Sequence, residues 1–152
     1  MPISKRNMPV TCTIEEAFEY VGDWSNFKNF MPMFVDIKPV SMVAYGPGTS
    51  LETVMVISKT EIVSTLDLVE FVKDKRILFR ATRGIKSKLS WDFSQLPDKV
   101  LIIYSFEYEI PDGLVRRDSE KDAIEKELDG YASQSMELLK WMLESQSALR
   151  KT

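Results

Sequence analysis

Apolar and polar residues alternate one by one along most of the middle of the chain. Residues 100–110 show this best, with one parity apolar or aromatic and the other largely polar. Such alternation is typical of a strand with one dry face and one solvated face, and we expect the face that carries Tyr104 and Phe106 to be interior. Related patterns predict strands over 3–11, 34–43, 50–58, 61–73, 76–83 and 86–95, with tight turns between them. The pattern therefore predicts an antiparallel sheet of six or seven strands, in which the strand that contains Pro39 lies at an edge or carries a bulge.

Two short helices are predicted before most of the strands and one long helix after them. Thr13 and Glu16 fit a capping box at the start of a helix over 14–21, and a second helix follows over about 25–30. From about Ser119 to Ser147 the apolar positions recur by threes and fours, giving a stripe of Ile124, Leu128, Tyr131, Ser135, Leu138 and Met142. We expect an α+β fold, with a curved sheet closed on one face by the long helix, and a single domain over 1–152.

Two residue types that support much protein chemistry are scarce. The chain contains no histidine and one cysteine, Cys12. A Ser/His/Asp triad, a Cys/His pair and a His-ligated zinc site are therefore excluded, and carboxylates alone would suit Mg²⁺ or Ca²⁺ instead. We expect no cofactor and no transition-metal site. A lone cysteine cannot form an internal disulfide and the first residues lack an apolar leader, which together predict a cytoplasmic setting.

The charge of the chain bears on its partners. The formal net charge is -3, which argues against general nucleic-acid binding, because that needs a basic surface to displace counterions. No apolar run approaches the ~20 residues of a membrane span. Arg116 and Arg117, with Lys5, Arg6, Lys86 and Lys88, could guide the domain to an anionic membrane. Surface charges are usually only solvating, so we do not expect peripheral membrane contact.

The order of elements resembles the START / polyketide cyclase / birch-allergen superfamily over nearly the whole chain. The resemblance is carried by residues 13–24, the Gly46-Pro47-Gly48 turn, residues 69–77, the turn over 110–113 and the helix ending 138–144. It implies a helix-grip fold with an internal cavity for lipids, quinones, polyketides or other apolar ligands. It is nearest the coenzyme Q-binding and polyketide cyclase branches. The aromatic-ring dioxygenases of the same superfamily use histidine iron ligands, which this chain lacks.

The inward faces of the predicted strands and the stripe of the long helix converge on a set of large apolar residues. We predict an interior void of about 300 Å³ or more. Its wall would consist of Trp24, Phe27, Phe30, Met55, Trp91, Tyr104, Phe106, Tyr131 and Ser135. The plain alternative is that each of these side chains only fills the core. The hydroxyls of Tyr104, Tyr108, Tyr131 and Ser135 could orient a ligand, although a bond to backbone or water is the commoner arrangement. Glu70 would reach the pocket rim if its strand parity faces inward, and otherwise is a solvated strand-end residue.

Three functions fit these expectations. The first is binding or transport of an apolar small molecule such as a lipid, quinone or isoprenoid. The second is a cyclase or dehydratase that acts through tyrosine and carboxylate groups, which would need an ionisable group in the cavity poised near neutral pH. The third is a protein-interaction module like the ribosome-associated toxin relatives, which would expose a large apolar patch. Without histidine we favour the first. No catalytic residue is singled out, and the oligomeric state is left open.

Overall fold

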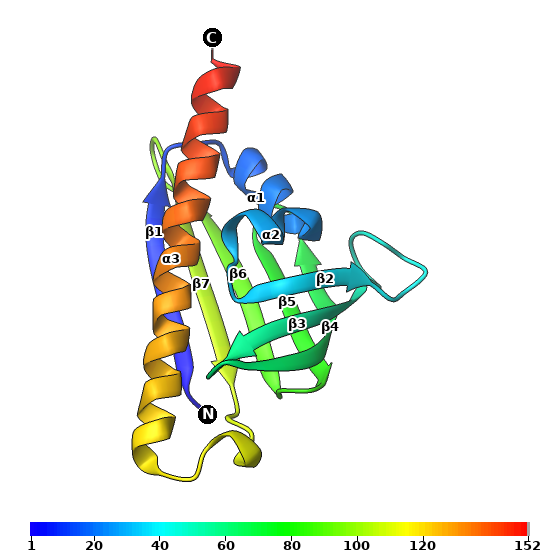
Figure 1. Ribbon diagram of the computed structural model, residues 1–152. Helices are drawn as coiled ribbons and strands as arrows, with labels where there is room; N and C mark the ends of the chain where they lie inside the picture. The colour runs from blue at the N-terminus through cyan, green and yellow to red at the C-terminus, as the bar shows by residue number, and fades with distance from the viewer. Residues whose placement is uncertain (152) are drawn as a thin grey trace.

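The computed structural model, described for residues 1–151, is one seven-stranded antiparallel sheet gripped by helices at one end and along one face (Figure 1). The strand order is β1-β7-β6-β5-β4-β3-β2, so β1 closes one edge and β2 the other. The elements are β1 Ile3–Val10, α1 Ile14–Gly22, η1 Trp24–Asn26, α2 Phe27–Phe30, β2 Phe34–Pro39, β3 Ser50–Ile57, β4 Thr60–Val72, β5 Arg76–Arg83, β6 Ser87–Gln95, β7 Val100–Tyr108, η2 Asp112–Leu114 and α3 Asp118–Arg150. The predicted fold class, a helix-grip arrangement with a curled sheet, is confirmed.

Strict alternation of buried and partly exposed residues marks the strands that lie over the core. In β7 every second residue from Val100 to Tyr108 is buried, and in β3 the same holds from Leu51 to Ile57. The interior position predicted for Tyr104 is thus confirmed, with only 2% of its surface exposed. The sheet curls because each strand twists relative to the next, and in Figure 1 β2 and β3 cross in front of β5 and β6, below α1 and α2.

Local chemistry sets the element boundaries near the N-terminus. The Thr13 hydroxyl accepts a bond from the Glu16 backbone N–H, and the Glu16 carboxylate accepts one from the Thr13 N–H. This is the predicted capping box, and it satisfies two amides that a helix start leaves free. The edge position predicted for the Pro39 strand is also confirmed, since β2 lies at the sheet edge and ends at Pro39.

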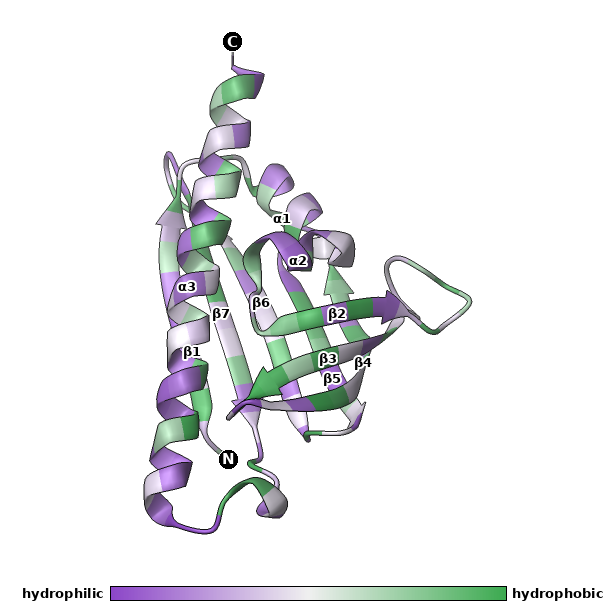
Figure 2. Cartoon of the chain, viewed as in Figure 1, coloured by the Kyte–Doolittle hydropathy of each residue, from purple (hydrophilic) through white to green (hydrophobic). Residues whose placement is uncertain are grey.

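The long helix α3 has two unlike faces, visible as alternating hydrophobic and hydrophilic bands in Figure 2. It packs on β1, α2, α1 and β3. The predicted stripe holds over its first half and at Met142, which is partly buried against the core, but it is wrong at Leu138. Beyond Ser135 the buried face follows Met136, Leu139 and Leu143. Leu138 lies on the outer side with about a third of its surface exposed. In the described chain no helix is long and apolar enough to cross a membrane.

Candidate functional site

Most of the nine residues predicted to line a cavity lie together in the interior. Phe27 is at the centre of this group, with its ring centroid 5.3 Å from that of Trp91 and 5.7 Å from that of Phe30. Trp91 in turn contacts Tyr104 edge-on at 5.9 Å. Met55 is buried in the same core. These side chains come from α2, β3, β6 and β7, so the sequence patterns did identify one spatial cluster.

The remaining predicted aromatic residues belong to this core or pack against it, and each has a further partner of its own. Trp24 lies outside the aromatic cluster, where its indole Nε1 donates to the Ala44 carbonyl oxygen at 2.6 Å. Phe106 stacks on Tyr108 with ring centroids 5.3 Å apart. Tyr131 is partly buried, and its hydroxyl donates to the Val56 carbonyl oxygen at 3.2 Å. That hydroxyl therefore serves the fold, which was the plainer of the two alternatives for it.

Ser135 differs from the other interior polar residues. It lies on the buried face of α3 with 3% of its surface exposed, and within residues 1–151 its Oγ has no hydrogen-bond partner. A buried hydroxyl without a partner loses its hydration and gains nothing in return. Ser135 is thus an unused hydrogen-bonding group in the apolar interior.

Two interior tyrosines keep their protons at neutral pH. Burial raises the pKa of Tyr104 well above its ordinary value, and the opposing effect of the Arg6 charge is much smaller. Burial raises the pKa of Tyr108 to about 12, and the nearby charges of Glu125 and Asp129 act in the same direction. Both phenols are therefore neutral hydroxyls rather than bases under physiological conditions.

An apolar hollow opens at the end of the sheet where η2 lies. This η2 hollow has a volume of about 370 Å³ and is lined by Ile62, Gly84, Ile85, Pro111, Gly113 and Leu114. It forms because the β5–β6 turn and the β7–α3 connection meet beside the start of β4. Gly84 adopts a positive φ of 84°, and a Cβ there would collide with the Val63 carbonyl and with Ser64. The turn therefore needs glycine at this position to place Ile85 in the wall.

Charged residues lie next to this opening. The same β7–α3 connection lines a second hollow of about 280 Å³, whose wall includes Arg116, Arg117 and Lys121 together with Asp112 and Asp118. The Arg116 backbone N–H donates to the Glu120 carboxylate at 2.8 Å. The mixed charges make this neighbouring surface polar, in contrast to the apolar η2 hollow.

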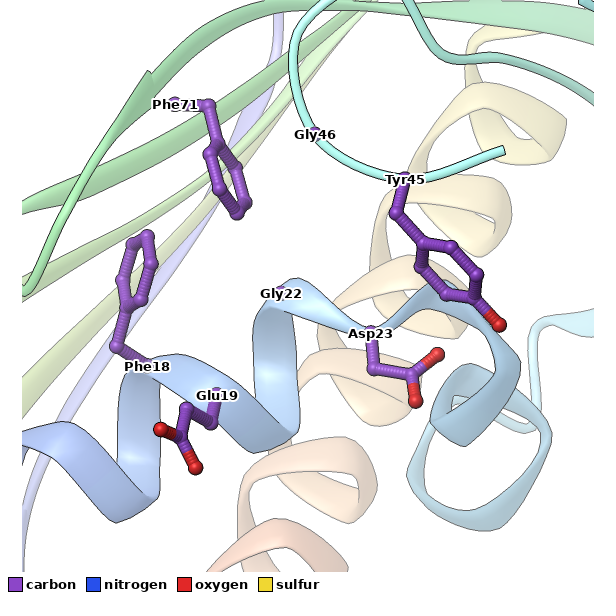
Figure 3. Close-up of a pocket in the computed structure, with 7 residues that line it drawn as sticks. All are labelled: Phe18, Glu19, Gly22, Asp23, Tyr45, Gly46 and Phe71. Atoms are coloured by element: carbon purple, nitrogen blue, oxygen red, sulfur yellow. The ribbon is translucent and has the colours of Figure 1, made fainter. Parts of the chain in front are cut away.

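A further hollow lies at the other end of the molecule, between α1 and the loop that joins β2 to β3 (Figure 3). This α1 hollow also has a volume of about 370 Å³. Its wall is made of Phe18, Glu19, Gly22, Asp23, Tyr45, Gly46 and Phe71. Figure 3 shows the Phe18 and Phe71 rings on one side and the Tyr45 ring on the other.

None of the nine predicted residues lines either the η2 hollow or the α1 hollow. The hollows belong to turn and helix-end residues that the alternation patterns passed over. Two signals were present, namely apolar Ile85 directly after Gly84 and apolar Leu114 directly after Pro111-Asp112-Gly113. Whether the nine interior residues contact a ligand stays a prediction.

Glu70 does not reach the interior. The register of β4 against β5 shifts between Leu68 and Glu70, so the parity that buries Leu68 does not continue. The Glu70 carboxylate is exposed and pairs with the Arg76 guanidinium at 3.2 Å. The solvated strand-end alternative for Glu70 is the one that the structure bears out.

The comparisons with known proteins agree with this architecture. The family described as polyketide cyclase / dehydrase and lipid transport matches residues 1–144. The chain belongs to this family. Its resemblance to the wider START-like superfamily, expected from the order of elements, is thereby confirmed. None of the curated proteins matches the chain.

Solved structures share the fold of this chain at low sequence identity. A protein from Thermus thermophilus is 14% identical with a TM-score of 0.76, over 96% of this chain and 99% of the other. A START superfamily protein from Mycobacterium smegmatis is 16% identical with a TM-score of 0.66, over 97% of each chain. The Zhui aromatase/cyclase from a Streptomyces species is 13% identical with a TM-score of 0.70, over 94% of this chain and 93% of the other. At identities this low, the structural similarity establishes the fold alone.

Proposed function

We propose that the protein binds an apolar small molecule through the η2 hollow, with the polar end of the ligand directed into the interior. The observation that carries the proposal is the lining of this hollow, which is almost entirely apolar and open to solvent. Exposed concave apolar surface is costly to hydrate, and it is the usual form of a small-molecule site. Membership of a family described by cyclisation, dehydration and lipid transport supports the same class of ligand.

The unpartnered hydroxyl of Ser135 supports the proposal from the interior. A ligand with a carbonyl or hydroxyl group would satisfy Ser135 Oγ, which has no partner within the described chain. The flexible side chains of Met55 and Met136 could rearrange around such a ligand at small cost, because methionine has three rotatable bonds. The predicted wall residues Trp91, Tyr104 and Phe106 would then contact its apolar body.

Binding, rather than turnover, is the function that these groups favour. An acid–base enzyme needs a group whose pKa lies near the working pH. The pKa values of the buried tyrosines are instead raised away from neutral pH, that of Tyr108 to about 12. They are suited to donate a hydrogen bond to a bound carbonyl, which a carrier needs and which involves no proton transfer.

The proposal is tested with the neutral fluorescent probe N-phenyl-1-naphthylamine. Leu114 lines the η2 hollow and is only partly buried where it packs against the core, so Leu114→Glu places a carboxylate in the hollow. A ligand that covers this carboxylate must desolvate it, and we expect affinity to fall at least about tenfold. Fluorescence titration measures the loss.

Leu138→Glu is the matched control, since Leu138 is a partly exposed leucine on the outer side of α3. It should leave probe affinity within about twofold of the wild type, a difference well under 1 kcal/mol. Equal losses in both variants, or no loss with Leu114→Glu, would contradict binding at the η2 hollow. Circular dichroism melting confirms that both variants are folded.

A further inference from the structure

The α1 hollow has aromatic walls that are fixed in place. The rings of Phe18 and Phe71 lie 5.0 Å apart at a tilt of 49° and form one wall. Tyr45 forms the opposite wall and stacks on Trp24 with ring centroids 6.2 Å apart. The Trp24 indole also holds the loop by its bond to the Ala44 carbonyl. Aromatic faces carry partial negative charge, so a hollow between them attracts a cation with an apolar body.

Negative charge gathers at the same place from α1. Glu19 of α1 and Asp23, the extended residue that follows the helix, both line the hollow, and Figure 3 shows the Asp23 carboxylate on the side of Tyr45. Asp23 is held in position because its Oδ1 accepts bonds from the backbone N–H and the hydroxyl of Ser25, at 3.1 and 2.6 Å. The C-terminal end of α1 is also here, and its last turn contains no basic residue. Each of these features favours a positive charge in the hollow.

No cation of the protein meets this demand within residues 1–151. Neither Glu19 nor Asp23 forms an ion pair with a lysine or arginine in the described chain. Glu16, on the same helix but outside the hollow, is paired with Arg150 at 3.0 Å. The two carboxylates at the hollow are thus uncompensated, while their neighbour on α1 is compensated.

Gly22 keeps the hollow open between these walls. A Cβ at this position would approach the Phe71 ring to 3.2 Å, closer than ordinary van der Waals contact. With glycine the space between Phe71 and the end of α1 stays free. The resulting volume, about 370 Å³, is enough for a small organic molecule but too small for a protein partner.

We propose that the α1 hollow is a second binding site, separate from the η2 hollow, for a small organic ammonium ion with an apolar substituent. The ammonium group lies between the Tyr45 ring and the Asp23 carboxylate, Glu19 adds negative charge from α1, and the substituent contacts Phe18 and Phe71. A free ammonium compound fits better than a phosphocholine headgroup, because the phosphate would face two carboxylates.

Benzyltrimethylammonium is the first probe, and its uncharged carbon isostere neopentylbenzene tests the need for charge. Choline and phosphocholine form a second pair, which distinguishes a free ammonium from the headgroup of a lipid. We expect amide chemical-shift changes at Gly22 and Gly46 with benzyltrimethylammonium, and at least about fivefold weaker binding of the isostere. Phosphocholine should bind more weakly than choline.

Variants of the wall decide the assignment. Glu19→Gln should weaken benzyltrimethylammonium binding about threefold, the effect of one solvent-exposed charge. Tyr45→Ala should weaken it about fivefold by removing an aromatic face. Glu15→Gln is the matched control, because Glu15 is an exposed acid of the same helix that does not line the hollow. It should have no effect.

Each contrary result overturns the proposal. These are no saturable binding at millimolar benzyltrimethylammonium, shifts that map away from Gly22 and Gly46, equal affinity for the isostere, equal losses with Glu19→Gln and Glu15→Gln, or tighter binding of phosphocholine than of choline. The effect of Leu114→Glu on naphthylamine binding is measured at the opposite end of the molecule. The two proposals are therefore tested independently.

Discussion

The hydroxyl of Ser135 is buried in α3 and has no partner in the part of the chain that the structure describes, whereas that of Ser147 on the same buried face donates to the Glu16 carboxylate at 3.0 Å. The two serines are equally buried, at 3% exposed. The pair therefore allows an unsatisfied hydroxyl to be compared with a hydrogen-bonded one in the same helix. An unsatisfied group costs its lost hydration, whereas a hydrogen bond to a charged acceptor contributes to stability.

We predict that Ser135→Ala raises the free energy of unfolding of the ligand-free protein by about 1 kcal/mol, and that Ser147→Ala lowers it by about 2 kcal/mol. If Ser135 meets the polar end of a ligand, Ser135→Ala should also weaken binding of a carbonyl-containing apolar compound. Urea unfolding with and without such a compound measures both effects. A Ser135→Ala variant that is less stable than the wild type would show that its hydroxyl is satisfied in solution.

At the scale of elements, α3 contains Gly130 in its middle, at an exposed position where an added Cβ would contact nothing. No neighbour approaches Gly130, so close packing on the sheet does not explain a glycine at this position. Glycine in a helix interior is unfavourable because its backbone loses more freedom on folding.

We predict that Gly130→Ala raises the free energy of unfolding by about 1 kcal/mol. Gly84→Ala is the opposite case, since Gly84 has a φ of 84° and its added Cβ would collide with backbone. It should destabilise the protein by more than about 1 kcal/mol. Chemical denaturation of both variants tests the pair. If Gly130→Ala destabilised the protein, Gly130 would be required for a contact or backbone conformation that the structure does not show.

The strands were predictable because one face of each meets the core, so burial imposes a period of two on the sequence. The second half of α3 was not, because its end extends past the sheet (Figure 1) and Ser147 and Arg150 bond there to Glu16 of α1. The direction of its partners changes, and the buried face moves to Leu139 and Leu143. Strand parity alone left two alternatives for Glu70, and a register shift in β4 decides for the solvated one because it breaks the parity that buries Leu68.

The aromatic cluster around Phe27 was predictable, because large apolar residues on inward faces must meet in a single core. The two hollows were not. Each is formed by turn or helix-end residues from segments far apart in the sequence, such as Ile62, Ile85 and Leu114. No periodic pattern connects such residues, because their proximity depends on how the turns close and not on the period of one element.

At the scale of the whole molecule, the end of α3 is fastened to the segment between β1 and α1. The Glu144 carboxylate accepts from the Thr11 N–H at 2.9 Å. The Glu16 carboxylate accepts from the Ser147 hydroxyl and from the Arg150 guanidinium, both at 3.0 Å. Cys12 lies buried under these contacts, and burial, then the charges of Glu16 and Glu144, raise the pKa of its thiol to about 11. Glu16 is thus a single carboxylate that caps α1 and anchors the far end of α3.

The Glu16 carboxyl group links this anchor to pH. Burial acts to raise its pKa, but the bonds from the Thr13 N–H, the Ser147 hydroxyl and Thr13 Oγ and the charge of Arg150 together lower the pKa below its ordinary value of 4.5. A group whose pKa is lower in the folded state stabilises that state above its unfolded pKa. This contribution is lost as the pH falls through the folded pKa. The anchor therefore stabilises the protein fully near neutral pH and weakens below pH 4.5.

We predict that Glu16→Gln lowers the free energy of unfolding at pH 7, because glutamine keeps the size of the side chain but pairs weakly with Arg150 and Thr13. The difference from the wild type should shrink as the pH falls below 4.5, since there the wild-type carboxylate becomes protonated and loses the same interactions. Urea unfolding at pH 7, 5, 4 and 3 measures the difference, and Glu15→Gln, on the same helix without such bonds, serves as the control. A difference that stays constant over this range would mean that the charge of Glu16 does not contribute, and that the helices are joined by their apolar contacts alone.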